Sequence, residues 1–208
     1  KVDNVFFYQE GKLVRHEEDI HRNGRINVWS YYDSQEKLVK REEDSNGDGK
    51  ADTLSFYQNG KLVRREEDSN GDGRVDIWSF FEGEKLVRRE VDADQKGRVN
   101  LWAYYRDGQL DRYQEDLNSD GRPDISYYFQ EGVKVREEES TKRNGQIDLW
   151  SFFEGDKLVR QEQTEAGKGK PNVFSFFQGG QLARRELDTN EDGKIDVWAF
   201  YQDGQQLT

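Results

Sequence analysis

The chain has 208 residues and a formal net charge of −11 at pH 7, with 36% charged and 32% hydrophobic residues. This acidic balance argues against nucleic acid as a general partner, and no apolar run approaches the roughly 20 residues of a membrane-spanning helix. The absence of cysteine excludes disulfides, thiolate metal sites and thiol nucleophiles. A mean hydropathy of −1.16 would favour disorder in an aperiodic chain. Aromatic residues recur here at fixed spacing, however, so we expect a folded protein.

Units of 24 residues repeat along the sequence. The unit that opens at Asp68 reads DSNGDGRVDIWSFFEGEKLVRREV, and it follows a close copy that opens at Asp44. Residues 19–43 form a unit that is one residue longer, and residues 1–18 match the later part of a unit. Such a period predicts a tandem repeat array, and because no linker interrupts it we expect one continuous repeat domain over residues 1–208. The units open at Asp19, Asp44, Asp68, Asp92, Asp116, Ser140, Thr164 and Asp188.

Each unit predicts two strands joined by a tight turn. In the Asp68 unit, residues 74–82 are rich in β-branched and aromatic types, which favour a strand. A second strand, such as residues 61–67, leads into an acidic loop. We therefore expect an all-β fold: an elongated tandem array of antiparallel β-hairpins, a solenoid or superhelical meander, with the acidic loops along one edge. The turn pairs that supply the positive φ of tight hairpins include Asn59-Gly60, Asp107-Gly108, Gly179-Gly180 and Asp203-Gly204.

Aromatic residues are expected on both faces of the first strand. Phe80 and Phe81 are adjacent and so point to opposite faces, and every unit carries such a pair. Because a strand that is apolar on both faces is usually covered on both sides, we expect the hairpins to wind into a superhelix or to fold over themselves. A closed propeller is the alternative. One aromatic ladder consists of Trp29, Trp78, Trp102, Trp150 and Trp198.

The second strand is mostly polar. A two-residue turn predicts that Arg65 lies opposite Leu54 and that Arg89 lies near Trp78, where an Arg could make a cation–π contact. The alternative is a solvated strand with cross-strand ion pairs.

The acidic loops carry oxygen ligands at regular positions, counted from the residue that opens each unit. Positions 1, 3, 5 and 9 are Asp, Asn, Asp and Asp, and glycine at position 6 allows a sharp bend, as in the front half of an EF-hand loop. The backbone carbonyl of position 7 could add a further ligand. Four loops match, and because Ca²⁺ prefers oxygen ligands we expect about four Ca²⁺ sites. The predicted ligand sets are Asp44, Asn46, Asp48, Lys50 and Asp52; Asp68, Asn70, Asp72, Arg74 and Asp76; Asp116, Asn118, Asp120, Arg122 and Asp124; and Asp188, Asn190, Asp192, Lys194 and Asp196.

Other units depart from these sets. Lys96 stands at position 5 between Asp94 and Asn100, and Lys142 and Lys168 stand at positions 3 and 5 of loops that have lost other acids. An internal ammonium group is thus expected to replace the cation there. The alternative interpretation is that the acidic loops are turns stabilised by Asx hydrogen bonds, without metal.

The loops are not EF-hands, because position 12 is not Glu and the following segment is strand. They resemble the Asp-x-Asp-x-Asp-Gly-x-x-Asp loops between strands of extracellular proteins such as integrin-type propellers, in which the position-9 Asp closes the site. That resemblance implies that the closing ligands are Asp52, Asp76, Asp124 and Asp196.

The hairpins, with their aromatic pairs and glycine turns, resemble MORN-type repeats and the repeats of choline- and glucan-binding modules. With the calcium loop added, the whole chain resembles the repeat lipoproteins of deltaproteobacterial cell envelopes. The resemblance carries no catalytic motif.

Two functions are expected from these observations. The first is a calcium-stabilised structural or adhesive repeat protein, acting as a spacer or interaction scaffold for a protein or glycan partner on a cell surface or envelope. The second is a carbohydrate-binding module whose aromatic ladders stack on sugar rings. No Ser/His/Asp or paired-carboxylate constellation stands apart from the repeat, so we expect no enzymatic activity. We expect an extracellular, periplasmic or outer-surface location, with a signal or lipid anchor lost from this fragment.

Overall fold

A computed structural model describes residues 3–164 and 170–207, and in that part the chain is all-β, with 18 strands and no helix. The predicted fold class, an array of antiparallel β-hairpins, is confirmed. The chain divides into two compact units, residues 1–108 and residues 109–208, and each is described by itself. Lys168 lies outside the described residues. Within the described ranges, no helix has the length and apolarity needed to cross a membrane.

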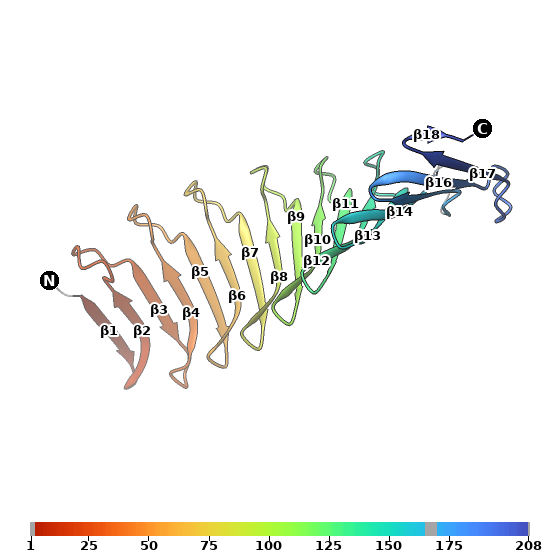
Figure 1. Ribbon diagram of the computed structural model, residues 1–208. Coiled ribbons are helices and arrows are strands. Elements are labelled where there is room, and N and C mark those ends of the chain that lie inside the picture. The colour runs from red at the N-terminus through yellow and green to blue at the C-terminus, as the bar shows by residue number, and fades with distance from the viewer. Residues whose placement is uncertain (1–2, 165–169, 208) are drawn as a thin grey trace. The chain divides into compact units, whose positions relative to one another are not determined.

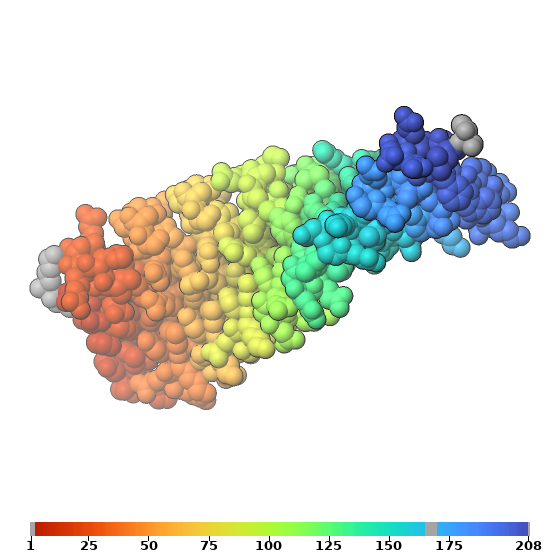
Figure 2. All heavy atoms as spheres, in the orientation of Figure 1, coloured from red at the N-terminus to blue at the C-terminus, as the bar shows by residue number. Residues whose placement is uncertain are grey.

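The first unit is a meander in which each strand pairs antiparallel with its neighbours in the sequence (Figure 1). Its tight turns lie at one edge and its acidic loops at the other, as predicted (Figure 1). The loops project from that edge as a row of separate protrusions (Figure 2). The strands are β1 (Asn4–Gln9), β2 (Lys12–Glu18), β3 (Val28–Tyr32), β4 (Leu38–Glu43), β5 (Thr53–Gln58), β6 (Lys61–Glu67), β7 (Ile77–Glu82), β8 (Lys85–Val91) and β9 (Leu101–Arg106).

The second unit repeats this arrangement. Each of its strands again pairs antiparallel with the strands that precede and follow it within the unit. The strands are β10 (Gln109–Glu115), β11 (Ile125–Gln130), β12 (Val133–Glu139), β13 (Leu149–Glu154), β14 (Lys157–Gln163), β15 (Val173–Gln178), β16 (Gln181–Leu187), β17 (Val197–Gln202) and β18 (Gln205–Gln206).

The tight turns have the backbone conformation that their residues predict. Asn59 and Gly60 have φ values of 52° and 75°, and the pair Asp107 and Gly108 has 51° and 82°. Two successive positive φ values define a type I′ turn, whose twist matches that of the flanking strands. The turn residues therefore set where each hairpin reverses.

A β-bulge shifts the register inside the hairpins. In β5–β6, Tyr57 pairs with Leu62 and Phe56 pairs with Arg64, so Val63 is an extra residue. The same shift lies between the two residues of the aromatic pair in six other hairpins. One extra residue turns every later side chain of the second strand to the opposite face.

The bulge makes the predicted arginine positions wrong. Arg65 lies opposite Ser55 rather than Leu54, and Arg89 lies opposite the equivalent serine rather than near Trp78. Arg64 and Arg88, which precede these two residues, lie opposite the rings of Phe56 and Phe80 instead. A sequence scan that assumes a regular two-residue hairpin cannot include this shift, because the bulged valine resembles its strand neighbours.

The shifted register brings second-strand cations over phenylalanine and tyrosine rings. The Cζ atom of Arg88 lies 4.1 Å from the centroid of the Phe80 ring, and six other rings have an equivalent cation above them. Arg88 also pairs at 3.3 Å with Glu90, two residues along the same strand. The predicted cation–π contact therefore occurs, with phenylalanine or tyrosine and not tryptophan as the partner, whereas this ion pair lies within one strand and not across strands as predicted. At such half-exposed sites each cation–π contact is worth about 0.5–1 kcal/mol.

Neither face of either sheet carries a second layer in the described residues. Within its unit each strand packs only against the strands before and after it, so the expectation that the hairpins fold over themselves is wrong. The strands of each unit form one hydrogen-bonded meander and do not separate into propeller blades. Long Arg and Glu side chains cover the rings instead, because their apolar stems can lie on a ring while the charged ends stay in water.

Prediction for the sheet face. In a double-mutant cycle, Arg88→Gln and Phe80→Leu are expected to couple by about 0.5–1 kcal/mol, because each substitution removes the same cation–π contact. Urea unfolding of the wild type, both single variants and the double variant measures this coupling. The control cycle combines Arg89→Gln with Trp78→Leu, which lie on opposite faces, and its coupling is expected to be near zero. Additive effects in the first cycle would contradict the assigned register.

Candidate metal centre

The bases of the acidic loops are the most buried part of the protein. Among the described residues, the buried apolar side chains are Val28, Val173 and Ala199, whereas loop positions 1 and 9 supply most of the buried polar ones. At the base, the backbone N–H of Asp68 donates to the carbonyl of Asp52 at 2.8 Å. The N–H of Asp52 in turn donates to the carbonyl of the residue before its own loop at 2.9 Å. These bonds continue the ladder of the sheet into the loops.

The position-1 carboxylate holds the loop backbone from inside. One oxygen of Asp44 accepts from the N–H of Gly47 at 2.6 Å, and the other accepts from Gly49 at 2.8 Å. The position-6 glycines of the four complete loops have φ values of 88–91°, a conformation that favours glycine. Asp68 accepts the same two bonds. Asp116 and Asp188 keep the bond from the position-6 glycine and accept the position-5 N–H at the other oxygen.

Positions 3, 5 and 7 form a chain of Asx hydrogen bonds. In the Asp44 loop, the side-chain oxygen of Asn46 accepts from the N–H of Asp48 at 2.8 Å, and Asp48 accepts from the N–H of Lys50 at 2.7 Å. The other three complete loops repeat this pair of bonds. Asp48 is exposed, unlike position 1. The Asx turns that the alternative interpretation predicts are therefore present.

The position-9 carboxylate is capped by a hydroxyl group that the sequence analysis missed. Asp52 accepts from both the N–H and the hydroxyl of Ser45 at position 2, each at 2.7 Å. The hydroxyl groups of Ser69 and Thr189 donate in the same way to Asp76 and Asp196, each at 2.8 Å. The sequence does carry a signal for this cap. Units with Ser or Thr at position 2 have Asp at position 9, whereas units with Ile20 or Ala93 at position 2 have Asn27 or Asn100 at position 9.

The hydroxyl caps favour the charged form of these carboxylates. Burial alone would raise the pKa of Asp52, but the hydrogen bonds from Ser45 and the N–H of Asn46 outweigh it and hold the pKa below its ordinary value. The hydrogen bonds from Thr189 likewise lower the pKa of Asp196. The hydrogen bonds from position 2 thus favour the negatively charged form of the position-9 carboxylate.

The donor types suit a hard cation, but the acids are not gathered around one point. Among the described residues, no three acidic or histidine side chains lie close enough together to hold a metal ion. Each predicted ligand lies in its expected loop, and the side-chain oxygens at positions 1, 3 and 5 accept from backbone N–H groups, as in the Asp44 loop. A carboxylate has about four lone-pair sites, so these bonds leave capacity for a cation. The Ca²⁺ sites therefore stay a prediction.

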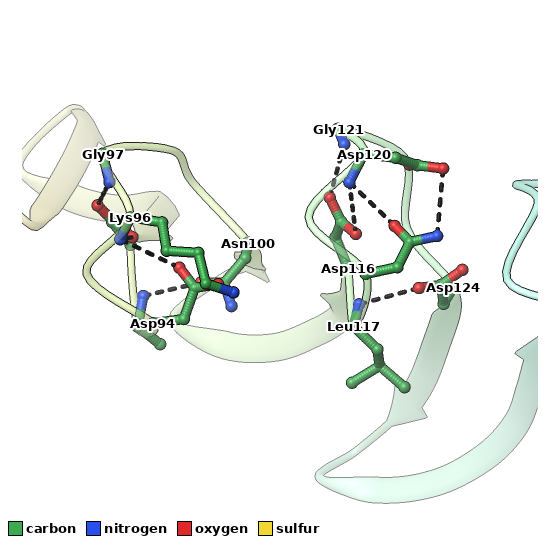
Figure 3. Close-up of polar contacts among 12 residues, drawn as sticks. Asp94, Lys96, Gly97, Asn100, Asp116, Leu117, Asp120, Gly121 and Asp124 are labelled. Atoms are coloured by element: carbon green, nitrogen blue, oxygen red, sulfur yellow. Dashed lines mark hydrogen bonds and ion pairs between the residues drawn. The ribbon is translucent and has the colours of Figure 1, made fainter.

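The loop that opens at Asp92 shows what replaces a lost acid. Lys96 at position 5 places its Nζ 2.7 Å from a carboxylate oxygen of Asp94, within the loop on one side of Figure 3. Asp92 still accepts from the N–H of Gly97 at 2.7 Å, as in the complete loops. The Lys96 ammonium group thus pairs with an acid of this loop, but its side chain is 62% exposed and not internal as expected. The bond between positions 1 and 6 persists although position 5 is not an acid.

Comparisons with known proteins give no family for this chain. No family model matches it, and no curated protein matches it. It has distant structural similarity to accessory secretory protein 1,2 and 3 of Streptococcus pneumoniae, with a TM-score of 0.34, 17% identity, and 46% of this chain and 20% of that one covered. A variant of S. aureus TarM, in complex with fondaparinux, alpha-GlcNAc-glycerol and UDP, has a TM-score of 0.25 at 13% identity over 57% of this chain and 20% of that one. The chain thus spans about a fifth of either structure.

Prediction for the loop base. Asp44→Ala is expected to lower the free energy of unfolding by about 2 kcal/mol or more, because it leaves two partly buried N–H groups without an acceptor. The matched control Asp48→Ala removes one exposed Asx bond and should cost about 0.5 kcal/mol or less. Urea unfolding in chelator separates these effects from metal binding. Equal losses in the two variants would show that position 1 does not hold the loop.

Proposed function

We propose that the chain is a calcium-stabilised structural or adhesive repeat protein that acts as a spacer or interaction scaffold outside the cell or in the cell envelope. The observation that carries the proposal is the recurrence of one loop architecture between hairpins that, in the residues the structure describes, pack only against neighbouring hairpins of their unit. In a single-layer array, each repeat is stabilised only by its neighbours. The loops between hairpins are therefore where a ligand would most affect stability.

The charge of the loops supports Ca²⁺ as that ligand. Each complete loop carries three carboxylates at positions 1, 5 and 9 and an amide oxygen at position 3. Ca²⁺ takes such oxygen ligands in flexible geometry, and a divalent cation would offset the mutual repulsion of the acids. A cation bound by both ends of one loop would join successive hairpins, so its binding free energy would add to folding stability.

The proposal is not enzymatic. The acids of one loop are repeated in the others, and each is engaged by the backbone of its own loop. The partner is expected on a cell surface or envelope, as a protein or a glycan that contacts the open sheet faces. That location and partner follow from the predicted loop type and the acidic surface.

A second candidate function, carbohydrate binding, is favoured by the exposure of the tryptophan ladder. Trp78 lies between Glu66 and Glu90 on the neighbouring strands, so carboxylate acceptors flank an aromatic ring that is only partly covered. Trp198 at the end of the ladder is 54% exposed. Sugar rings stack on such partly exposed aromatic faces while acids accept their hydroxyl groups.

Prediction for calcium. Titration with CaCl2 is expected to give heat for about four sites, the number of complete loops, with dissociation constants on the order of 10⁻⁴–10⁻³ M. Chelator should lower the melting temperature. Asp72→Ala, which removes an exposed ligand and spares the buried loop base, should remove one site, whereas Asp94→Ala in the Lys96 loop should change nothing in the titration. No heat at millimolar Ca²⁺ together with unchanged melting in chelator would reduce the loops to Asx turns.

Prediction for glycans. If the second function holds, soluble glucan or chitin oligosaccharides shift tryptophan fluorescence, because stacking changes the surroundings of the ring. Trp78→Ala should weaken that response. The control Phe81→Leu lies on the opposite face and should leave it intact. A fluorescence spectrum that is unchanged at millimolar oligosaccharide would remove carbohydrate binding and leave the structural function.

A further inference from the structure

One complete loop differs from the other three at position 2. In the loop that opens at Asp116, Leu117 stands where the others have Ser45, Ser69 or Thr189. The N–H of Leu117 still donates to one oxygen of Asp124, at 2.9 Å. Leucine has no hydroxyl group, however, and the second oxygen of Asp124 is buried without a hydrogen-bond partner.

This carboxylate is also more buried than its equivalents. Asp124 is 1% exposed and Asp116 is 2% exposed, and both belong to the small set of fully buried side chains in the protein. Figure 3 shows the second oxygen of Asp124 turned away from Leu117, on the side of the loop where the Asp120 carboxylate lies. A buried carboxylate oxygen without a donor is costly unless a cation compensates it.

The surroundings add negative charge. Burial raises the pKa of Glu139, and the nearby carboxylates of Glu137 and Asp148 raise it further, with Arg143 offsetting part of the effect. Glu139 and Asp124 are neighbours through Ile125, which pairs with Glu139 across the sheet. The second oxygen of Asp124 has no hydrogen-bond donor among the described residues, so this loop has no counterpart of the ion pair that Lys96 forms in the Asp92 loop.

In other units the position-9 side chain is satisfied in one of two ways. Where position 2 has a hydroxyl group, that group caps the position-9 carboxylate. Where position 2 is Ile20 or Ala93, position 9 is an uncharged Asn, whose oxygen accepts the position-2 N–H at 2.9 or 2.8 Å. Only the Asp116 loop, among the loops that the structure describes, combines an apolar position 2 with a charged position 9.

We propose that the Asp116 loop is the principal cation site of the chain, where Ca²⁺ binds first and stabilises most, because Leu117 leaves an oxygen of Asp124 for the metal. This inference rests on the proposed calcium function and adds an order among the sites. The other three loops satisfy their position-9 carboxylate internally, so metal adds less there. Asp116, Asn118 and Asp120 supply the remaining oxygen donors of the same loop.

The test uses a pair of reciprocal substitutions in the full chain. Leu117→Ser supplies the missing hydroxyl group, and because Leu117 is 45% exposed the change removes little packing. It should raise the melting temperature in chelator, shrink the rise that CaCl2 produces, and weaken the tightest site by about tenfold, the equivalent of one hydrogen bond to a charged group. Ser69→Leu creates the same arrangement in the Asp68 loop and should lower melting in chelator and enlarge the CaCl2 effect.

Two further measurements locate the site. In a CaCl2 titration followed by NMR, the amide signals of Leu117 and Gly121 should shift at lower Ca²⁺ than those of Ser69 and Gly73. Asp124→Asn should abolish the early shift while melting in chelator stays equal to or above that of the wild type, as expected when a buried unpaired charge is removed.

The outcomes separate the two proposals. Calcium binding by the wild type with no early shift at Leu117, or with no effect of Leu117→Ser, overturns the order of sites and leaves the calcium function intact. No calcium binding at all overturns both. In that case a stabilising Leu117→Ser would show that the oxygen of Asp124 lacked only a hydrogen-bond donor.

Discussion

The closure of each acidic loop by its first and ninth residues supports the rest of the structure. Most of these side chains are buried at the loop bases, where a globular domain would have aliphatic residues. Asp44 holds two loop N–H groups, and Asp52 receives the hydroxyl group of Ser45. The sheet ladder continues through the same residues, so the loop base sets the distance and register between one hairpin and the next.

Stability is consequently spread along the chain instead of being concentrated in a core. In the described part of the chain, each strand contacts only its neighbours within a unit, and no second layer covers either face of the sheet in each unit. The rings of the first strands are covered by Arg and Glu side chains of the adjacent second strands, and each such contact is individually weak. Many small, repeated contacts can hold such an array because a repeat needs to be stabilised only against the repeats beside it.

Different positions of the acidic loops close the loop and set its charge, two roles that a calcium motif usually combines. Positions 1 and 9 are structural even in the degenerate loop at Asp92, where Asp92 and Asn100 keep their bonds to the loop backbone with Lys96 in place of an acid. Positions 3 and 5 are exposed and differ between units, so they tune charge without opening the loop. Position 2 decides whether the ninth carboxylate is satisfied internally, and Leu117 is the exception that leaves it to a cation in our proposal.

The sequence by itself determined the all-β class, the repeat length, the tight turns and the placement of acids in loops at one edge. Those features depend on local chemistry: Asn-Gly and Asp-Gly pairs reverse the chain, aromatic and β-branched runs form strands, and Asp-rich loops fold around their own N–H groups. The pairing of Ser45 with Asp52 could also have been predicted from the covariation of positions 2 and 9. Only the tertiary structure decided the bulge at Val63, which moves Arg65 away from Leu54, and the absence of a second layer over the rings. Both depend on how neighbouring strands fit together, because a one-residue shift and the cover of a ring by a long charged side chain leave no mark in the composition of a single strand.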